Sequence, residues 1–391
     1  MFSQFLFRWP LTALLAAALV LCVAGGTPRA ASLSAPSCAT PELDPKIGQM
    51  IMVGFPGDGE KDPGVIAVRD QLAKGLIGGV VLFPENIASP KRLKNLIAYL
   101  RNARSMPMPF IAVDQEGGKV QRLNRWNGHS NFPSAQRVAR NPSYASPEAA
   151  QKLYAKMAAE LAEAGFNMNL GPVVDLNTNP RNPVIGARGR SFSNDPDTVT
   201  ALATAFIKAH RAANVLTVAK HFPGHGSSRV DSHKALADVS KTWREVELEP
   251  YRRLAKDGLL DAVMVGHLYH PRFSDMEKLP ASLSAKAIRA LRTKTWIDFN
   301  GVIISDDMEM GAVRGKFTID ERAVRAIRTG TDIVVFSNVQ SSDHELGVKV
   351  HTAIAKAVCD GRVSRERIEQ SYGKIMLLKR RLQQKDLSGK W

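Results

Sequence analysis

The sequence predicts an α/β protein built as a single (β/α)₈ barrel of the TIM type, with a C-terminal helix packed outside it. Eight short runs rich in Val and Ile alternate with longer amphipathic segments from residue 46 onward. Most of these runs are continuously apolar, as in parallel strands that are covered on both faces. Polar groups follow the strands at Asp114, Asp175, Lys220, His267 and Asp306. A barrel gathers all such strand ends at one mouth.

The predicted strands lie at residues 49–55, 78–83, 110–113, 168–174, 216–219, 262–266, 302–305 and 332–336, and the first is expected to be slightly irregular. The predicted helices lie at residues 65–73, 90–103, 147–164, 196–213, 243–257, 285–293 and 319–329. Several helices begin with Ser-Pro or Asp-Pro, which places a capping residue before a Pro at the first helical position. A doubly wound open sheet is the main alternative, and it would spread the polar strand ends along an edge.

The barrel is expected to occupy residues 46–385, with a basic outer helix over 362–385 and a tail at 386–391. Residues 1–31 predict a signal peptide, because Arg8 precedes an uncharged apolar run at 11–24 that falls short of the ~20 residues needed to span a bilayer. Residues 32–45 then form an N-terminal extension. We expect export to the periplasm or beyond, with no stable membrane span after cleavage. A retained N-terminal anchor is the alternative.

Composition indicates an ordinary globular core, with 44% hydrophobic and 23% charged residues. The formal net charge of +16 comes from Lys and Arg residues that are dispersed along the chain rather than gathered with aromatic residues. We therefore predict no nucleic-acid partner, and we expect a monomer. In an oxidising compartment Cys38 and Cys359 could pair. The sequence does not set their separation, so this disulfide is left open.

Proton-transfer groups are concentrated in the stretch Lys-His-Phe-Pro-Gly-His-Gly at 220–226, which continues to Asp231 and His233. The stretch follows an apolar run at 215–219, so we expect its side chains on a loop at the barrel mouth. His221 and His225 have the i, i+4 spacing of a helical zinc pair, which Asp231 and His233 could complete. A Pro-Gly pair between the two His residues does not belong in a helix interior. We predict neither a metal nor an organic cofactor.

Two adjacent carboxylates, Asp306 and Asp307, follow the predicted strand 302–305. Side chains alternate between the two faces of a strand, so a straight strand can direct only one of them into the mouth. The alternation does not say which, and helix capping is the natural role of the other.

Two further segments predict contacts with a polar ligand. Asp114 opens Asp-Gln-Glu-Gly-Gly at 114–118, where paired glycines allow a ligand close to the backbone, and Arg122 follows. A carboxylate at this place can accept hydrogen bonds from two neighbouring hydroxyls of a sugar. A long loop rich in Asn and Arg runs from Asp175 to Arg190, which is typical of substrate recognition.

Together these motifs resemble glycoside hydrolase family 3, and within it the NagZ-type β-N-acetylglucosaminidases. The resemblance spans almost the whole chain after residue 46, and it rests on five motifs: Asp-Gln-Glu-Gly-Gly at 114–118 with Arg122, Gly-Pro-Val-Val-Asp at 171–175, Asn-Pro-Val-Ile-Gly at 182–186 with Arg190-Ser191-Phe192, the stretch at 220–226 with Asp231-Ser232-His233, and Ser305-Asp306-Asp307. Ser227-Ser228 stand where the family often has Asp-Thr, and Lys119 where Arg is more usual. Neither departure removes a catalytic group.

The resemblance implies a role for each matching position. It implies that Asp306 is the nucleophile that forms a glycosyl-enzyme, and that His233 is the general acid/base with Asp231 as its partner. It also implies that five residues hold the N-acetylglucosamine ring: Asp114, Arg122, Arg190, Lys220 and His221. An imidazole has an ordinary pKa of about 6.5, which suits donation to a leaving oxygen and later deprotonation of water. A Gly-rich loop would let this imidazole move in once substrate is bound.

The implied activity is a retaining exo-β-N-acetylglucosaminidase acting on peptidoglycan fragments or chitin-type oligosaccharides. A phosphorylase is one alternative, because a neutral imidazole does not repel phosphate as acceptor; N-acetylglucosamine 1-phosphate as main product would indicate it. A non-catalytic cell-wall-binding protein is an alternative of another class. Its signature would be the loss of Asp306, Asp231 or His233, and all three are present.

Overall fold

The computed structural model describes residues 42–386 except 105 and 341. The predicted signal peptide, Cys38 and the end of the tail, at 387–391, lie outside the described residues. Cys359 is disulfide-bonded. Within the described ranges, no helix combines the length and the apolar character needed to cross a bilayer.

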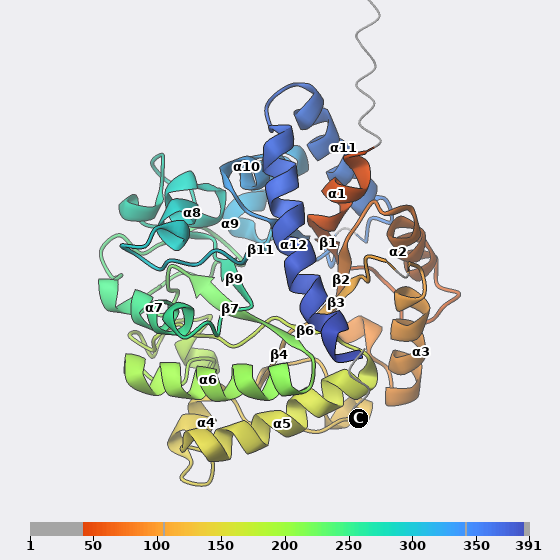
Figure 1. Ribbon diagram of the computed structural model, residues 1–391. Coiled ribbons are helices and arrows are strands. Elements are labelled where there is room, and N and C mark those ends of the chain that lie inside the picture. Colours follow the sequence, from red (N-terminus) through yellow and green to blue (C-terminus); the bar gives the residue numbers. More distant parts are fainter. Residues whose placement is uncertain (1–41, 105, 341, 387–391) are drawn as a thin grey trace, which may run out of the picture. The chain divides into compact units, whose positions relative to one another are not determined.

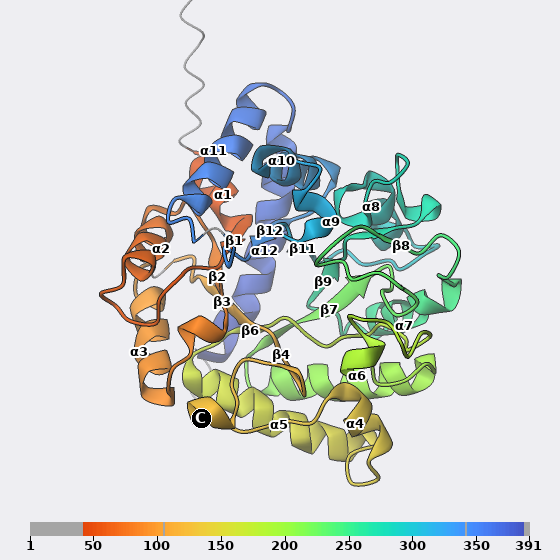
Figure 2. The ribbon, with the colours of Figure 1, turned by 180° about the vertical axis from the view of Figure 1, so that it is seen from behind.

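Eight parallel strands close into a barrel surrounded by helices, which confirms the predicted fold class (Figure 1, Figure 2). The strands follow one another around the barrel in the order β1-β12-β11-β9-β7-β6-β3-β2. Their bounds are β1 Ile51–Val53, β2 Gly79–Leu82, β3 Phe110–Val113, β6 Met168–Asn169, β7 Leu216–Phe222, β9 Ala262–Val265, β11 Val302–Asp307 and β12 Ile333–Phe336. The first and last strands pair in regular register, with Ile51 opposite Val334. The barrel therefore closes by pairing its first strand in the sequence, β1, with its last, β12.

Two small sheets lie outside the barrel, β4 Gln115–Gly117 with β5 Val120–Gln121, and β8 Ala237–Asp238 with β10 Leu268–Tyr269. The irregular pairings of the barrel are not in the first strand. They lie where β7 meets β9, between Ala219 and Phe222, and where β11 meets β12, between Ile304 and Asp307. Both irregularities therefore fall at the strand ends where the predicted site residues begin.

The strand that leads into the 220–226 stretch differs from the prediction. Lys220 and His221 were expected on a loop, but β7 extends to Phe222 and includes both. Both side chains are buried; Lys220 is ion-paired with Asp114, and His221 Nδ1 lies 2.7 Å from a carboxylate oxygen of Asp175. Because paired charges can be buried at much lower free energy than isolated ones, the strand continues through these polar residues.

The α-helices lie outside the barrel strands, with bounds α1 Asp44–Gln49, α2 Pro63–Lys74, α3 Pro90–Arg101, α4 Ala135–Arg140, α5 Pro147–Ala164, α6 Pro196–Ala212, α7 Glu249–Lys256, α8 Ala285–Arg292, α9 Gly311–Arg314, α10 Ile319–Thr329, α11 Leu346–Cys359 and α12 Arg365–Asp386. Ser89, Ser146 and Asp195 cap α3, α5 and α6 as predicted. The predicted helix 243–257 is divided, because a 3₁₀ helix at Glu245–Leu248 precedes α7. The predicted helix list lacks α11, which begins without a capping side chain.

The basic C-terminal helix α12 lies across the N-terminal ends of several barrel strands (Figure 1). Its Lys379 is buried and donates to Gln49 Oε1 at 2.7 Å and to the Gly78 carbonyl at 3.0 Å, just before β1 and β2. The same ammonium group lies 4.4 Å from the centre of the Phe110 ring, at the start of β3. Burial lowers the pKa of Lys379 to about 7. This helix closes one end of the barrel with a buried amine.

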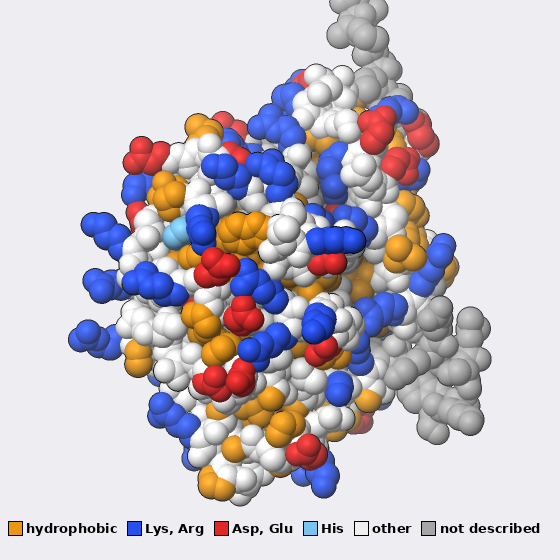
Figure 3. Space-filling model, turned by 60° about the vertical axis from the view of Figure 1, so that its left-hand side comes forward, with side chains coloured by type: hydrophobic (Ala, Val, Ile, Leu, Met, Phe, Trp, Pro, Cys, Tyr) orange, Lys and Arg blue, Asp and Glu red, His pale blue; other side chains and the backbone are white. Residues whose placement is uncertain are grey.

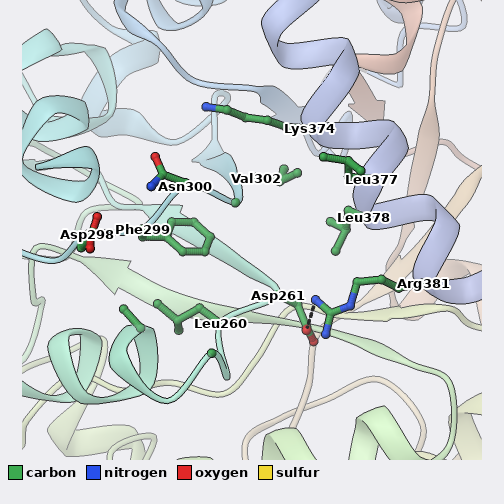
Figure 4. A pocket seen from close by; sticks show the side chains of 13 residues that line it. Leu260, Asp261, Asp298, Phe299, Asn300, Val302, Lys374, Leu377, Leu378 and Arg381 are labelled. Atoms are coloured by element: carbon green, nitrogen blue, oxygen red, sulfur yellow. Dashed lines mark ion pairs between the residues drawn. The ribbon is translucent and has the colours of Figure 1, made fainter. Parts of the chain in front are cut away.

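A hollow of about 300 Å³ lies beside α12, at the N-terminal ends of β9 and β11 (Figure 4). Its walls combine apolar side chains such as Phe299 and Leu377 with the ion pair between Arg381 and Asp261, at 2.8 Å. None of the predicted site residues lines it. It therefore lies at the opposite end of the barrel from the predicted mouth.

Charged side chains of both signs are scattered over the face that Figure 3 shows, with apolar side chains between them. Lys and Arg are spread across this face rather than gathered into a single stripe. The excess of positive charge on this face is thus dispersed in space as well as in sequence.

Relative to Lys379→Met, the wild-type unfolding free energy is expected to rise with pH between about 7 and 10.5. In this window the unfolded chain binds more protons than the folded chain, because the folded pKa of Lys379 is depressed from 10.5. The difference should be constant below the folded value, and each pKa unit corresponds to about 1.4 kcal/mol. Urea unfolding of both proteins across this range measures the difference.

The exposed neighbour Arg380, changed to Gln, is the matched control for loss of a positive charge on α12. The difference in unfolding free energy between this variant and wild type should not vary with pH across the same range. If the stability difference between wild type and Lys379→Met is equally independent of pH, the lowered pKa of the buried lysine is contradicted.

Candidate active site

A cavity of about 490 Å³ opens at the C-terminal ends of the barrel strands, a size within the usual range of ligand pockets. All eight predicted site residues line this one cavity: Asp114, Arg122, Arg190, Lys220, His221, Asp231, His233 and Asp306. Apolar side chains such as Leu170 and Met264 line it as well. The barrel thus brings an aspartate late in the chain and an imidazole from its middle to the same opening.

Buried ion pairs connect three segments at one side of the cavity. Lys220 Nζ donates to Asp114 Oδ1 at 2.7 Å and lies 2.8 Å from Glu116 Oε1. Arg190 binds Glu116 in a bidentate manner, with both N–O distances at 2.8 Å. Arg122 reaches the second oxygen of Asp114 at 3.3 Å. Each of the two carboxylates, the buried Glu116 and the part-buried Asp114, therefore has two cationic partners.

The cations keep these carboxylates ionised in spite of burial. Burial alone would raise the pKa of Glu116, but Arg190 and Lys220 outweigh it and hold that pKa at about 2. For Asp114, burial again acts to raise the pKa, while Lys220 and Arg122 lower it below its ordinary value. The pKa of Lys220 is raised: burial would lower it, but Asp114 and Glu116 overcome that effect. The cluster stays fully charged near neutral pH.

Asp175, which is fully buried, orients the two His residues of the 220–226 stretch. Its carboxylate accepts from the backbone N–H groups of His221 and His225, at 3.1 and 2.7 Å, and lies 2.7 Å from His221 Nδ1. Burial lowers the pKa of His225 to about 4, so its ring is neutral. The Nε2 atom of His225 lies 2.9 Å from the Oγ atom of Ser232. In the sequence, Ser232 stands between the predicted dyad residues Asp231 and His233. Across residues 42–386 as described, no group of three His, Cys, Asp or Glu side chains is placed to hold a metal ion.

Glycine is required where the stretch turns away from β7. A Cβ atom at Gly226 would lie 1.6 Å from the Leu176 carbonyl oxygen, and Gly224 has a φ of +122° that side chains rarely permit. Asn182 Nδ2 donates to the carbonyl of His225 at 2.7 Å, which ties the turn to the preceding loop. The stretch is therefore fixed at its base, before the dyad residues are reached.

Both carboxylates at the end of β11 line the cavity, because this strand is not straight there. The expectation that a single one would face the mouth holds only for a straight strand. Asp307 Oδ1 accepts from the N–H groups of Glu309 and Ser337, at 3.0 and 2.9 Å, and burial raises the pKa of Asp307 to about 6. Its carboxyl group is thus engaged by backbone, as a cap would be.

Asp306 has a different environment from its neighbour. Its Oδ1 atom accepts only from the Asp307 N–H, at 2.9 Å, among the described hydrogen bonds. Burial acts to raise the pKa of Asp306, but interactions with His221, His267 and His233 lower it below 3.8. His267, the remaining polar group predicted at a strand end, lies beside this carboxylate rather than in the cavity wall, with its ring nitrogens on Ser282 Oγ and the Asp307 carbonyl. Asp306 is therefore an ionised carboxylate that can accept further hydrogen bonds.

The predicted dyad lies on the loop after β7. His233 Nδ1 is 2.8 Å from Asp231 Oδ1, and the same oxygen accepts from the His233 backbone N–H at 3.0 Å. The His233 side chain is 61% exposed, whereas that of Asp231 is 18% exposed. The ring is thus oriented from one side and open to solvent on the other.

Comparison with known proteins decides the family. The family described as "Glycosyl hydrolase family 3 N terminal domain" matches residues 42–378, which is most of the chain. The chain belongs to glycosyl hydrolase family 3. It is a glycoside hydrolase, which confirms the prediction of an enzyme.

Two curated relatives and one solved structure illustrate the similarity. A beta-hexosaminidase of Nitrosomonas eutropha is 35% identical over 285 residues, covering 71% of this chain and 78% of that protein. A beta-hexosaminidase of Tolumonas auensis is 38% identical over 276 residues, covering 69% and 78%. The glycoside hydrolase family 3 beta-N-acetylglucosaminidase of Paenibacillus sp. str. FPU-7 has a TM-score of 0.78 at 34% identity, covering 87% of this chain but only 62% of that one.

Three residues of this family 3 hydrolase complete the site although no role was assigned to them from the sequence: Glu116, Asp175 and His225. Glu116 neutralises Arg190 and Lys220, and Asp175 holds His221. The i, i+2 spacing of Asp114 and Glu116 was the available signal, since such residues share one side of an extended segment. A carboxylate that binds other site residues leaves no further mark in a single sequence.

Glu116→Gln is expected to destabilise the folded protein by about 3 kcal/mol, because it leaves Arg190 and Lys220 buried with unbalanced charge. The folded pKa of Glu116 is about 2 and its ordinary value is 4.5. The stabilisation from its charge is therefore complete above about pH 4.5 and is lost as pH falls towards 2. Denaturant unfolding at several pH values measures this difference.

Glu60→Gln serves as the control, since that exposed carboxylate lines no cavity described above. A stability loss that is no larger for Glu116→Gln than for this control would contradict the role of Glu116 in the buried cluster.

Proposed function

We propose that this family 3 hydrolase is a retaining exo-β-N-acetylhexosaminidase that removes terminal β-linked N-acetylglucosamine. The observation that carries the proposal is that Asp306 and the Asp231–His233 pair line one cavity with the cluster of charged side chains around Lys220. The names of the curated relatives and of the Paenibacillus structure support the sugar specificity. The reaction needs no group beyond these side chains and water.

Asp306 is proposed as the nucleophile. A retaining glycosidase uses one carboxylate to attack the anomeric carbon, forming a glycosyl-enzyme that water then hydrolyses. The lowered pKa of Asp306 supports this role, because the attacking group must be ionised. Asp307 is less suited, since burial raises its pKa and two backbone N–H groups occupy one of its oxygens.

His233 is proposed as the acid/base. In the first step its protonated ring would donate to the leaving oxygen, and in the second the neutral ring would accept a proton from the attacking water. Asp231, bonded to Nδ1, would orient the ring and stabilise its protonated form, which leaves Nε2 for the transfer. The exposure of His233 supports a loop that brings the ring towards the bound sugar.

The charged cluster is proposed to hold the sugar ring. Asp114 can accept from sugar hydroxyls, while Arg122, Arg190, Lys220 and His221 can donate to hydroxyl and carbonyl oxygens. Because the ion pairs already fix these side chains, little conformational entropy is lost when the sugar binds.

We further propose that the enzyme is an exported monomer, periplasmic or secreted, acting on peptidoglycan fragments or chitin-type oligosaccharides. The apolar run at 11–24 after Arg8 supports export. The net charge of +16 supports action near acidic polymers of the cell envelope.

Asp306→Ala is expected to abolish aryl release from an aryl β-N-acetylglucosaminide, because no other ionised carboxylate with free capacity lies beside it at the end of β11. Asp307→Ala should keep measurable turnover. Initial rates for both variants, with thermal unfolding to confirm that each is folded, provide the measurement. An inactive, folded Asp307→Ala beside an active Asp306→Ala would reverse the assignment within the pair.

His233→Gln is expected to reduce kcat/KM at least about 100-fold for a phenyl glycoside but less than about tenfold for a dinitrophenyl glycoside. Dinitrophenolate leaves without protonation, so a missing general acid matters only for the poorer leaving group. His344→Gln, an exposed His outside this cavity, is the control for loss of an imidazole. Equal losses for the two leaving groups would rule out His233 as the acid.

A further inference from the structure

A second cavity, of about 620 Å³, lies beside the loop that carries the dyad. Four cationic side chains line it, those of Arg181, Arg229, Lys241 and Arg244, together with the hydroxyl groups of Ser227 and Thr242. Within the described ranges, no carboxylate side chain and no aliphatic side chain lines this basic pocket. The side chains of its wall therefore offer mainly hydrogen-bond donors and positive charge.

The basic pocket lies at the same end of the barrel as the sugar cavity, because its residues come from the loop after β6 and from two segments between β7 and α7, one before β8 and one after it. Arg229 stands two positions before Asp231 on the dyad loop. Asn179, which also lines the pocket, donates from Nδ2 to the Ser228 carbonyl at 2.8 Å. The pocket thus joins the dyad loop to the neighbouring loop from β6.

The four cations are gathered without compensating acids. In the part of the chain that the structure describes, none of them forms an ion pair, although other surface cations are paired. Glu245, next to Arg244 in the chain, binds Arg252 and Arg272 instead, at 2.8 and 2.9 Å. Like charges held together repel one another, so the gathering is unfavourable until an anion enters.

Two hydroxyl groups of the pocket have few hydrogen-bond partners. The hydroxyl oxygens of Ser227 and Thr242 are buried; Thr242 Oγ1 has no hydrogen-bond partner among the described residues, and the Ser227 side chain interacts with Glu247. The buried carboxyl group of Glu247 lies close to Ser227, and burial raises the pKa of Glu247 to about 8. The nearby acid is therefore neutral at neutral pH and does not cancel the positive charge.

We propose that this basic pocket is an oxyanion-binding site that takes a phosphate, sulfate or carboxylate group. Guanidinium groups match such anions with paired N–H donors, and the serine and threonine hydroxyls supply further donors. A bound anion bridges Arg229 on the dyad loop to Arg181 and Arg244 on neighbouring segments. It therefore restrains the backbone that leads to Asp231 and His233.

The site goes beyond the proposed glycosidase activity and does not depend on it. The anion has two possible sources with the same chemistry. One is an acidic group on the part of a saccharide beyond the cleaved bond, and the other is a free oxyanion. An acidic saccharide group and a free oxyanion would both bind the same four cations. Anion binding is therefore tested first, and the source of the anion second.

Titration calorimetry of the full chain with sulfate, at constant ionic strength set by chloride, tests the site. Sulfate is chosen because it cannot act as acceptor in the proposed reaction. We expect one sulfate per chain, and at least about tenfold weaker binding in the double variant Arg229→Gln/Arg244→Gln. The control Arg140→Gln/Arg328→Gln removes the same charge from exposed positions on α4 and α10 and should keep the wild-type affinity.

Equal losses in the two double variants, or no stoichiometric binding to the wild type, would overturn the proposal. The source follows from KM values for a β-N-acetylglucosaminide with a carboxylate on its second sugar and for neutral diacetylchitobiose. A higher KM for the acidic substrate alone, in the pocket variant, identifies the substrate as the source. Unchanged KM values beside lost sulfate binding identify a free anion. A chain that binds sulfate but cleaves no glycoside would refute the proposed function and leave the site intact.

Discussion

The ion pairs between Lys220 and the carboxylates of Asp114 and Glu116 are the constraint on which the rest of the site depends. A buried ammonium group without partners would be neutralised or would unfold the strand that carries it. With partners from the segment after β3, it allows β7 to continue as a strand into the catalytic stretch. The same pairs fix Arg190 through Glu116, so one cluster sets the strand length and the donors that face the sugar.

One side of the cavity is formed by residues on barrel strands, and the other by a loop with an exposed side chain. Asp306, Lys220 and Asp114 stand on or directly after barrel strands, where parallel pairing limits their movement. The Asp231–His233 pair stands on a loop, anchored at its base by Asn182 and Gly226 but exposed at the imidazole. In the proposed reaction the nucleophile requires a fixed position, whereas the acid/base serves first the leaving group and then water. The division of rigidity in the fold matches these two requirements.

The sequence was sufficient to predict the barrel and to predict that the eight site residues lie together. Apolar runs locate the strands, and parallel strands end on the same side of the barrel. The sequence failed where a residue's role depends on partners distant in the chain. Lys220 and His221 looked like loop residues because their compensating carboxylates are 106 and 46 positions away. The two aspartates of β11 could not be told apart by alternation, since a register shift against β12 is a tertiary feature. The basic pocket was missed because its four cations belong to three loop segments that are separate in the sequence.

The closure of the barrel by α12 has a consequence for biosynthesis. Lys379 meets Gln49 and the Gly78 carbonyl, which precede it by 330 and 301 positions. While the ribosome is still elongating the chain, β1 and β2 have emerged but the helix that covers their N-terminal ends does not yet exist. Contacts of such long sequence separation form late, so the nascent polypeptide remains open to chaperones until α12 has left the ribosome. That delay suits a precursor that, as proposed here, is threaded through a translocation channel before it folds.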